Sequence, residues 1–182
     1  MFNFFVTVAI LQSRCERRVF GRSPVVSRAS GVAGAVLCFV PFLLLSPLKA
    51  LGGLLVFKKI RDKLGTGFRG GVSGGGALPP YIDEFFWAVG INVVEGYGLT
   101  ETAPVVAVRP MSKPVFGTIG TPISCCTVKI LDDEGRELPP GSKGTVYVKG
   151  RNVMRGYYRK PELTAKVLSS DGWLATGAGA YT

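Results

Sequence analysis

Two glycine-rich loops, separated by one helix and one short strand, constrain the fold of this chain more than any other feature. The first loop runs from residue 73 to 79 and the second from residue 95 to 102. Pro79 and Pro80 are typical of a helix start, and Gly90 is typical of a helix end. Between them, apolar side chains recur at helical spacing, at Ile82, Phe85, Phe86 and Val89.

Short apolar segments on either side of this helix predict strands at Phe68–Ser73 and Ile91–Val94. The order strand, loop, helix, strand, loop is that of a parallel βαβ unit. In such sheets ligands lie at the carboxyl ends of the strands, which is where both glycine loops fall. Beyond Pro110 the pattern is typical of strands at 127–131 and 145–149, separated by turn residues. We therefore expect an α/β fold with a partial parallel βαβ layer and a small antiparallel β subdomain.

The basic character of the chain belongs to its N-terminal third. Residues 1–67 hold ten Lys and Arg and two acidic residues, whereas residues 68–182 hold twelve and ten. The basic residues flank apolar runs instead of being interleaved with aromatics, which favours a membrane surface or a targeting machinery over nucleic acid. The apolar start followed by an Arg- and Ser-rich, acid-poor stretch resembles a signal or transit segment.

The apolar run Val32–Leu45 spans roughly 21 Å as a helix, less than the roughly 30 Å hydrocarbon core of a bilayer. Pro41, Ser46, Pro47 and Lys49 are expected to interrupt its extension toward Phe57. Two interpretations of this run stay open. It is either a buried helix, or sequence that precedes the folded domain and is not part of it, or it belongs to a membrane surface contact through residues 1–60. We place a targeting-like or unstructured segment at 1–46 and a folded domain at 47–182, with a helix that ends near Gly65.

Residue types exclude several kinds of chemistry. The chain has no histidine, which excludes Ser-His and Cys-His nucleophilic catalysis and the common His-ligated metal sites. Its four cysteines have no metal-ligand spacing, so we expect reduced thiols and an intracellular protein. The chemistry left is that of phosphate-binding backbone, carboxylates, hydroxyls or an oxygen-held metal.

The first loop contains Gly74, Gly75 and Gly76, which hold no side chain between a ligand and the backbone amides. A triple glycine also occurs in linkers and tight turns. In the second loop, Tyr97 offers a stacking face, Thr100 a hydroxyl for a phosphate and Glu101 a carboxylate for Mg²⁺. Taken singly, these three residues are equally typical of a core aromatic, a helix cap and a favourable first-turn charge.

Taken together, the string GYGLTET at 96–102 resembles the signature of the AMP-forming adenylate-forming superfamily. The upstream SGGGALP and the later segments at 117–122, 138–144, 153–162 and 171–177 agree with it in order and spacing. The match is most similar to the long-chain fatty acyl-CoA synthetase branch, including its acyl-ACP synthetase-like members. It runs from about Pro47 to Gly177, and it implies that residues 47–182 are a partial AMP-binding (adenylation) domain.

The resemblance implies an ATP-dependent ligase that forms an acyl-adenylate from a long-chain fatty acid and transfers the acyl group to a CoA or acyl-carrier-protein thiol. Its cofactors would be ATP or AMP and Mg²⁺, with coenzyme A as co-substrate. It implies Thr100 and Glu101 as catalytic residues, with Glu101 as metal ligand. It implies nucleotide contacts from Gly74, Gly75, Gly76, Glu95, Gly96, Tyr97, Gly98 and Thr100. Plastid or endoplasmic reticulum membranes are the expected location.

Three departures from the family pattern predict that these 182 residues alone do not catalyse acyl activation. The family's Ser/Thr/Gly-rich phosphate loop does not occur before residue 95, and the lysine-bearing C-terminal domain is expected beyond Thr182. The third is Ala178, which stands where the family has a ribose-binding Asp, so AMP is expected to bind weakly. Two alternatives stay open, a non-catalytic nucleotide-binding or membrane-associated module and a membrane-anchored structural protein.

Overall fold

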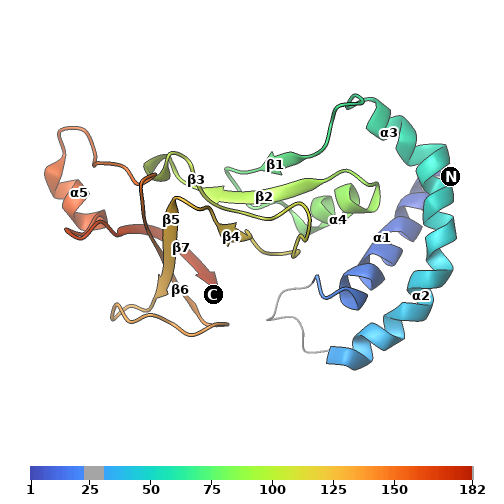
Figure 1. Ribbon diagram of the computed structural model, residues 1–182, viewed down its shortest axis with the longest axis horizontal. Coiled ribbons are helices and arrows are strands. Elements are labelled where there is room, and N and C mark those ends of the chain that lie inside the picture. Colours follow the sequence, from blue (N-terminus) through green and yellow to red (C-terminus); the bar gives the residue numbers. More distant parts are fainter. Residues whose placement is uncertain (23–30, 182) are drawn as a thin grey trace. The chain divides into compact units, whose positions relative to one another are not determined.

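The computed structural model describes residues 1–22 and 31–181 (Figure 1). Its contacts divide the chain into two compact units. The first comprises Met1–Glu95 and Arg109–Thr118, and the second comprises Gly96–Val108 and Ile119–Thr182.

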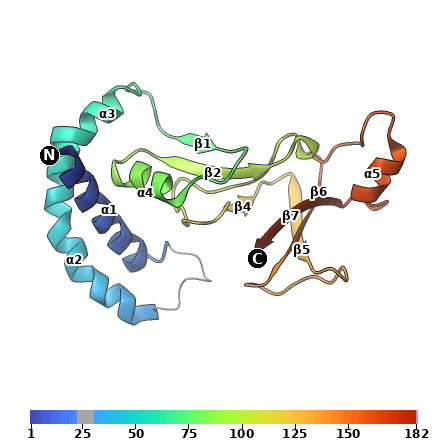
Figure 2. The same ribbon diagram turned by 180° about the vertical axis from the view of Figure 1, so that it is seen from behind.

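The first unit begins with two helical rods that lie side by side (Figures 1 and 2). α1 spans Phe2–Val19. The second rod is continuous and consists of α2 (Gly31–Gly52), the π-helical turn η2 (Gly53–Phe57) and α3 (Lys58–Asp62). Gly65, with φ +89°, follows the last turn, so the predicted helix end is confirmed.

The expected interruption at Pro41 and Pro47 is wrong, because both prolines lie inside α2. A helix can continue past a proline with the loss of one backbone hydrogen bond when neighbouring contacts compensate. Here α2 packs against α1 closely enough that a Cβ on Gly52 would strike the Phe5 ring. Lys49 is accommodated in this apolar helix because its Nζ donates to Gln12 Oε1, at 2.9 Å, and to Ser13 Oγ, at 3.2 Å.

The α2–α3 rod is long and apolar enough to cross a membrane by length and composition, over Ala33–Asp62. Only 6% of the most apolar 18-residue stretch of this rod is buried inside the protein.

The hydrophobic core of the first unit joins the N-terminal helices to the predicted βαβ segment. Its buried members are Phe5, Ala9, Phe57, Ala88, Val89 and Ile91. Residues 1–46, expected to be targeting-like or unstructured, therefore include a helix that shares a core with residues 57–91. The division of the chain at residue 46 stays a prediction.

The predicted βαβ unit is confirmed. β1 (Gly71–Ser73) and β2 (Val93–Gly98) are parallel, with Gly71 opposite Val93 and Ser73 opposite Glu95. α4 (Pro80–Ala88) lies between them in sequence and begins at the predicted proline. Gly90, with φ +76°, turns the chain out of this helix as expected.

The expectation that residues 95–98 form a loop is wrong, because β2 continues through Gly98. Gly96 and Tyr97 pair with Val108 and Ala107 of β3 (Val105–Val108), which returns antiparallel. The register shifts between Tyr97 and Gly98, as in a β-bulge. Glycine and polar residues give residues 95–98 the composition of a loop. They form a strand because β3, which comes later in the sequence, pairs with them.

The second unit contains the predicted antiparallel sheet, in the order β5 (Cys126–Leu131), β6 (Lys143–Gly150) and β7 (Leu174–Tyr181) (Figures 1 and 2). α5 (Pro161–Val167) precedes β7. A two-residue strand, β4 (Thr121–Pro122), pairs with β3. Val106, Ile130, Val146 and Val148 form the buried core.

A buried arginine holds the first unit's βαβ segment together. Arg109 is 1% exposed, and its guanidinium donates to Asp83 Oδ2 at 2.7 Å and to Glu95 Oε2 at 3.1 Å. Its Nε and Nη2 also donate to the Thr118 carbonyl oxygen, at 3.0 and 2.9 Å. One side chain thus connects α4, β2 and the segment that follows β3.

Replacing Arg109 tests how much its ion pairs contribute to the unfolding free energy. Arg109→Met would leave Asp83 and Glu95 as buried carboxylates without their cation, which costs about 3–5 kcal/mol of unfolding free energy. Urea denaturation of the chain followed by circular dichroism measures this loss. The control Arg136→Met removes an exposed arginine that pairs with Asp132 at a hairpin turn, and should leave the midpoint unchanged. Equal midpoints for the two variants would contradict the assignment.

Candidate functional site

The first glycine loop belongs to the first unit and is open to solvent. Gly74, Gly75 and Gly76 are exposed, and a Cβ at Gly75 or Gly76 would meet no atom within 4 Å. Gly75 has φ +83°, a conformation that other residues rarely adopt. The loop therefore presents bare backbone, as a close-approaching ligand requires.

Glu95 ties this loop to the sheet. Its Oε1 accepts a hydrogen bond from the Leu78 amide at 3.1 Å, while its Oε2 receives the Arg109 guanidinium. Both carboxylate oxygens therefore have protein donors. The geometry makes Glu95 an anchor of the loop, and its expected contact with a nucleotide stays a prediction.

The second loop belongs, apart from Glu95, to the second unit and is closed by a threonine. Its turn, η3 (Thr100–Thr102), places Thr102 fully inside the protein. The Thr102 Oγ1 accepts from the Leu99 amide at 3.0 Å and lies within hydrogen-bond distance of the Leu99 and Pro104 carbonyl oxygens. The same turn leaves Thr100 exposed and Glu101 half-buried. The two residues predicted to meet phosphate and metal are thus the accessible residues of the turn.

Tyr97 packs as a core aromatic. Its half-buried ring lies against the cluster formed by Val106, Ile130, Val146 and Val148. Its hydroxyl is buried and has no hydrogen-bond partner in the part of the chain that the structure describes. The ring therefore has a packing role in the fold, and its expected role with adenine stays a prediction.

Gly98 is required by the fold of the turn. A Cβ at this position would collide with the Pro104 carbonyl oxygen, which belongs to the returning strand segment. This close approach explains the second glycine of the GYG string without reference to a ligand. Gly96 pairs with Val108 in the β2–β3 ladder.

Glu101 meets a residue from a later motif. The Tyr157 hydroxyl donates to Glu101 Oε1 at 2.9 Å, and the Met154 amide donates to the Glu101 carbonyl oxygen at 2.8 Å. The hydrogen bond to Glu101 raises the pKa of Tyr157, with a further contribution from desolvation. No pattern in the sequence predicted this contact between residues 56 positions apart.

The donor set fits a magnesium ion that arrives with a nucleotide. Within residues 1–22 and 31–181, no three His, Cys, Asp or Glu side chains lie together as a metal site. A magnesium ion bound by one or two carboxylates takes its other ligands from phosphate and water. Glu101 is the carboxylate expected in this role, and Thr100 precedes it in the same turn; both roles stay predictions.

The position where the family has a ribose-binding Asp lies in β7. Ala178 is half-buried there, and its amide donates to Thr176 Oγ1 at 3.1 Å. Thr176 in turn donates to the Val146 carbonyl oxygen of β6 at 2.9 Å. The strand geometry is set by these contacts and requires no side chain beyond Cβ at 178.

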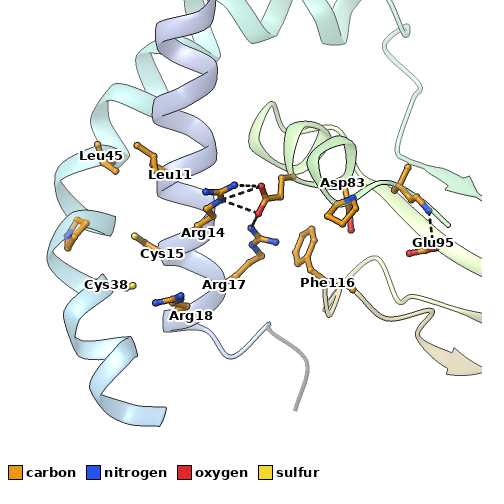
Figure 3. Close-up of a pocket in the computed structure, with 15 residues that line it drawn as sticks. Leu11, Arg14, Cys15, Arg17, Arg18, Cys38, Leu45, Asp83, Glu95 and Phe116 are labelled. Carbon is orange, nitrogen blue, oxygen red and sulfur yellow. Dashed lines mark hydrogen bonds and ion pairs between the residues drawn. The ribbon is translucent and has the colours of Figure 1, made fainter. Parts of the chain in front are cut away.

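A hollow of about 770 Å³ in the first unit was not expected from the sequence (Figure 3). It lies among α1, α2 and α4, and Leu78 and Glu95 also line it. Arg14 and Arg17 reach Glu84 at its wall. Burial alone would raise the pKa of Glu84, but hydrogen bonds from the two arginines outweigh it, and the net shift is downward.

Residues 33–158 match the profile of the AMP-binding enzyme family. The chain belongs to the AMP-binding enzyme family. The matched range contains both glycine loops, the η3 turn and Tyr157, so the family resemblance seen in the motifs is confirmed.

Plant and bacterial relatives share this region. The probable acyl-activating enzyme 16, chloroplastic, of Arabidopsis thaliana is 52% identical over 72% of this chain and 18% of its own length. The long-chain-fatty-acid–[acyl-carrier-protein] ligase AEE15, chloroplastic, of the same plant is 47% identical over 74% of this chain and 18% of its own. A long-chain-fatty-acid–CoA ligase of Haemophilus influenzae is 46% identical over 48% of this chain and 16% of its own. The chain thus spans less than a fifth of the length of these relatives.

Solved structures show the same fold. MatB from Rhodopseudomonas palustris, in its apo form, aligns with a TM-score of 0.57 and 34% identity, over 62% of this chain and 23% of that one. The anthranilate CoA ligase AuaEII in complex with anthranoyl-AMP aligns with a TM-score of 0.57 and 27% identity, over 61% of this chain and 22% of that one. The expected α/β architecture with an antiparallel β sheet is therefore that of adenylate-forming enzymes.

The steric role of Gly98 gives a test that needs no ligand. Gly98→Ala should lower the thermal midpoint of the chain clearly, because its methyl group displaces the Pro104 carbonyl oxygen and opens the η3 turn. The matched control is Gly76→Ala, whose methyl group enters open space. Differential scanning calorimetry measures both midpoints. A Gly98→Ala midpoint equal to that of Gly76→Ala would contradict the close approach.

Proposed function

We propose that this chain carries part of the ATP site of a ligase that activates a long-chain fatty acid as an acyl-adenylate and transfers it to a thiol of coenzyme A or of an acyl-carrier protein. Family membership and the names of the relatives support this substrate class. The observation that carries the proposal is the η3 turn, which buries Thr102 while keeping Thr100 and Glu101 accessible.

In this proposal, the Thr100 hydroxyl donates to a phosphate oxygen of ATP, and the Glu101 carboxylate holds the Mg²⁺ of the nucleotide. When bound, Mg²⁺ would neutralise negative charge that develops on the phosphates of ATP while the carboxylate of the fatty acid attacks. Gly74, Gly75 and Gly76 offer backbone to the adenylate, and Gly96, Tyr97 and Gly98 form the adenine side. Glu95 contributes by anchoring the first loop at Leu78.

We further propose a plastid location, which the chloroplastic names of the two Arabidopsis relatives support.

A non-catalytic nucleotide-binding module is the alternative to the ligase function. The observation that favours it is Ala178, because loss of a ribose-binding carboxylate weakens adenylate binding without altering the β7 strand.

Membrane contact through the N-terminal third is a separate proposal, and the exposed residues of the α2–α3 rod support it. Leu37, Leu44 and Leu54 are 76%, 68% and 71% exposed. Lys58 and Lys59 follow them and are also exposed. Apolar side chains next to lysines are the combination that binds anionic lipid surfaces.

Vesicle binding tests this contact. The chain should co-sediment with vesicles of equal parts phosphatidylcholine and phosphatidylglycerol more than with phosphatidylcholine alone. Because each surface lysine contributes about 1 kcal/mol near an anionic membrane, Lys58→Glu with Lys59→Glu should reduce binding more than tenfold. Lys166→Glu, an exposed lysine of α5, is the control and should leave binding unchanged. An equal loss of vesicle binding in the double variant and in the Lys166→Glu control would rule out a lipid site on the α2–α3 rod.

Nucleotide binding by the chain tests the proposed ATP site. Calorimetry with Mg-ATP should show affinity that Thr100→Ala lowers between about tenfold and a hundredfold, because a hydrogen bond to a charged group contributes about 1.5–3 kcal/mol. Glu101→Gln should weaken Mg-ATP and leave metal-free AMP unaffected, whereas Ala178→Asp should strengthen AMP. The control is Glu134→Gln, at an exposed hairpin turn.

Absence of any nucleotide binding to the folded chain would contradict the proposed site. Binding that Thr100→Ala and Glu101→Gln leave unchanged would place the nucleotide elsewhere.

A further inference from the structure

The contact between Glu101 and Tyr157 joins two motifs that the sequence analysis treated separately. Glu101 belongs to the η3 turn, and Tyr157 belongs to the segment 153–158 that follows β6. Both lie in the second unit. The hydroxyl–carboxylate bond of 2.9 Å is supported by the backbone bond from Met154 to the Glu101 carbonyl oxygen, so the two segments are joined at side-chain and backbone level.

Tyr157 is itself held in a defined backbone position. Its amide donates to Thr164 Oγ1 at 2.9 Å, and the Thr164 hydroxyl lies 3.0 Å from the Lys160 carbonyl oxygen. The neighbouring Gly156 has φ +141°, and a Cβ there would collide with the Thr164 side chain. The start of α5 therefore fixes the backbone from which the Tyr157 ring projects.

The arrangement leaves half of the carboxylate available. In the described part of the chain, Glu101 Oε1 accepts from Tyr157, and Oε2 has no protein donor. Ligating carboxylates are commonly oriented by a hydrogen bond to an oxygen, and such outer partners influence metal affinity strongly. A neutral phenol suits this task because it donates one proton and adds no competing charge.

We infer that Tyr157 is a positioning residue, which orients the Glu101 carboxylate so that Oε2 faces the magnesium ion of a bound nucleotide. This inference rests on the proposed function of Glu101. A purely structural bond is the competing explanation, and the exposure of Tyr157 speaks against it, since 37% of the residue remains in contact with solvent. Exposed hydrogen bonds of this kind contribute little to folding.

The adjacent tyrosine provides a matched control. Tyr158 is 82% exposed, and its ring meets the Arg159 guanidinium at 5.2 Å. Tyr157→Phe removes the hydroxyl that reaches Glu101, whereas Tyr158→Phe removes the same atom one residue later. Any effect of losing a phenol from this segment in general should appear in both variants.

The measurement that tests this inference is the affinity of Mn²⁺, in place of Mg²⁺, for the complex of the chain with ATP, followed by electron paramagnetic resonance. Tyr157→Phe should weaken Mn²⁺ about tenfold or more, as loss of an outer partner does, while metal-free ATP affinity stays constant. Tyr158→Phe should change neither affinity. Equal Mn²⁺ affinity in all versions that bind ATP would overturn the inference and leave the proposed function intact. Failure of the unmodified chain to bind ATP would overturn both.

Discussion

The ion network around Arg109 is the interaction on which the first glycine loop depends. One guanidinium pairs with two carboxylates, so neutral hydrogen-bond donors must help to stabilise the second carboxylate. The Leu78 amide is such a donor, since it reaches the second oxygen of Glu95. The stabilisation of this carboxylate and the position of the exposed loop are therefore linked. A loop that must present bare glycine backbone cannot hold itself in place by side chains, and this anchor supplies what the glycines lack.

Local patterns predicted the elements whose stability is local. The helix at 80–88 and the hairpin strands of β5 and β6 have clear periodicity and turn residues, and both are present as expected. Tertiary pairing decided the elements that were missed. β2 extends through Gly96 and Gly98 because β3 returns beside it, and α2 continues through Pro41 because α1 packs against it. Neither partner is visible in the composition of the segment it stabilises.

The candidate site shows the same division between local and long-range information. Thr100 and Glu101 could be recognised from their motif, because their spacing on one turn is fixed by the chain itself. The contacts that position them could not. Arg109 was one basic residue among many, and Tyr157 was part of a motif with no assigned chemistry. A cation that is fully buried and a phenol that reaches a carboxylate 56 residues away have no signature at short range.

The closure of the second loop by Thr102 has a thermodynamic consequence for binding. Because the turn is held by its own buried hydroxyl and by the return of β3, its ordering entropy is lost when the protein folds and not when a ligand arrives. A nucleotide meeting Thr100 and Glu101 would encounter groups already fixed in space. The affinity would then include no cost for ordering the turn, although the cost of immobilising the nucleotide itself remains. Recognition at this turn would therefore resemble docking onto a rigid surface.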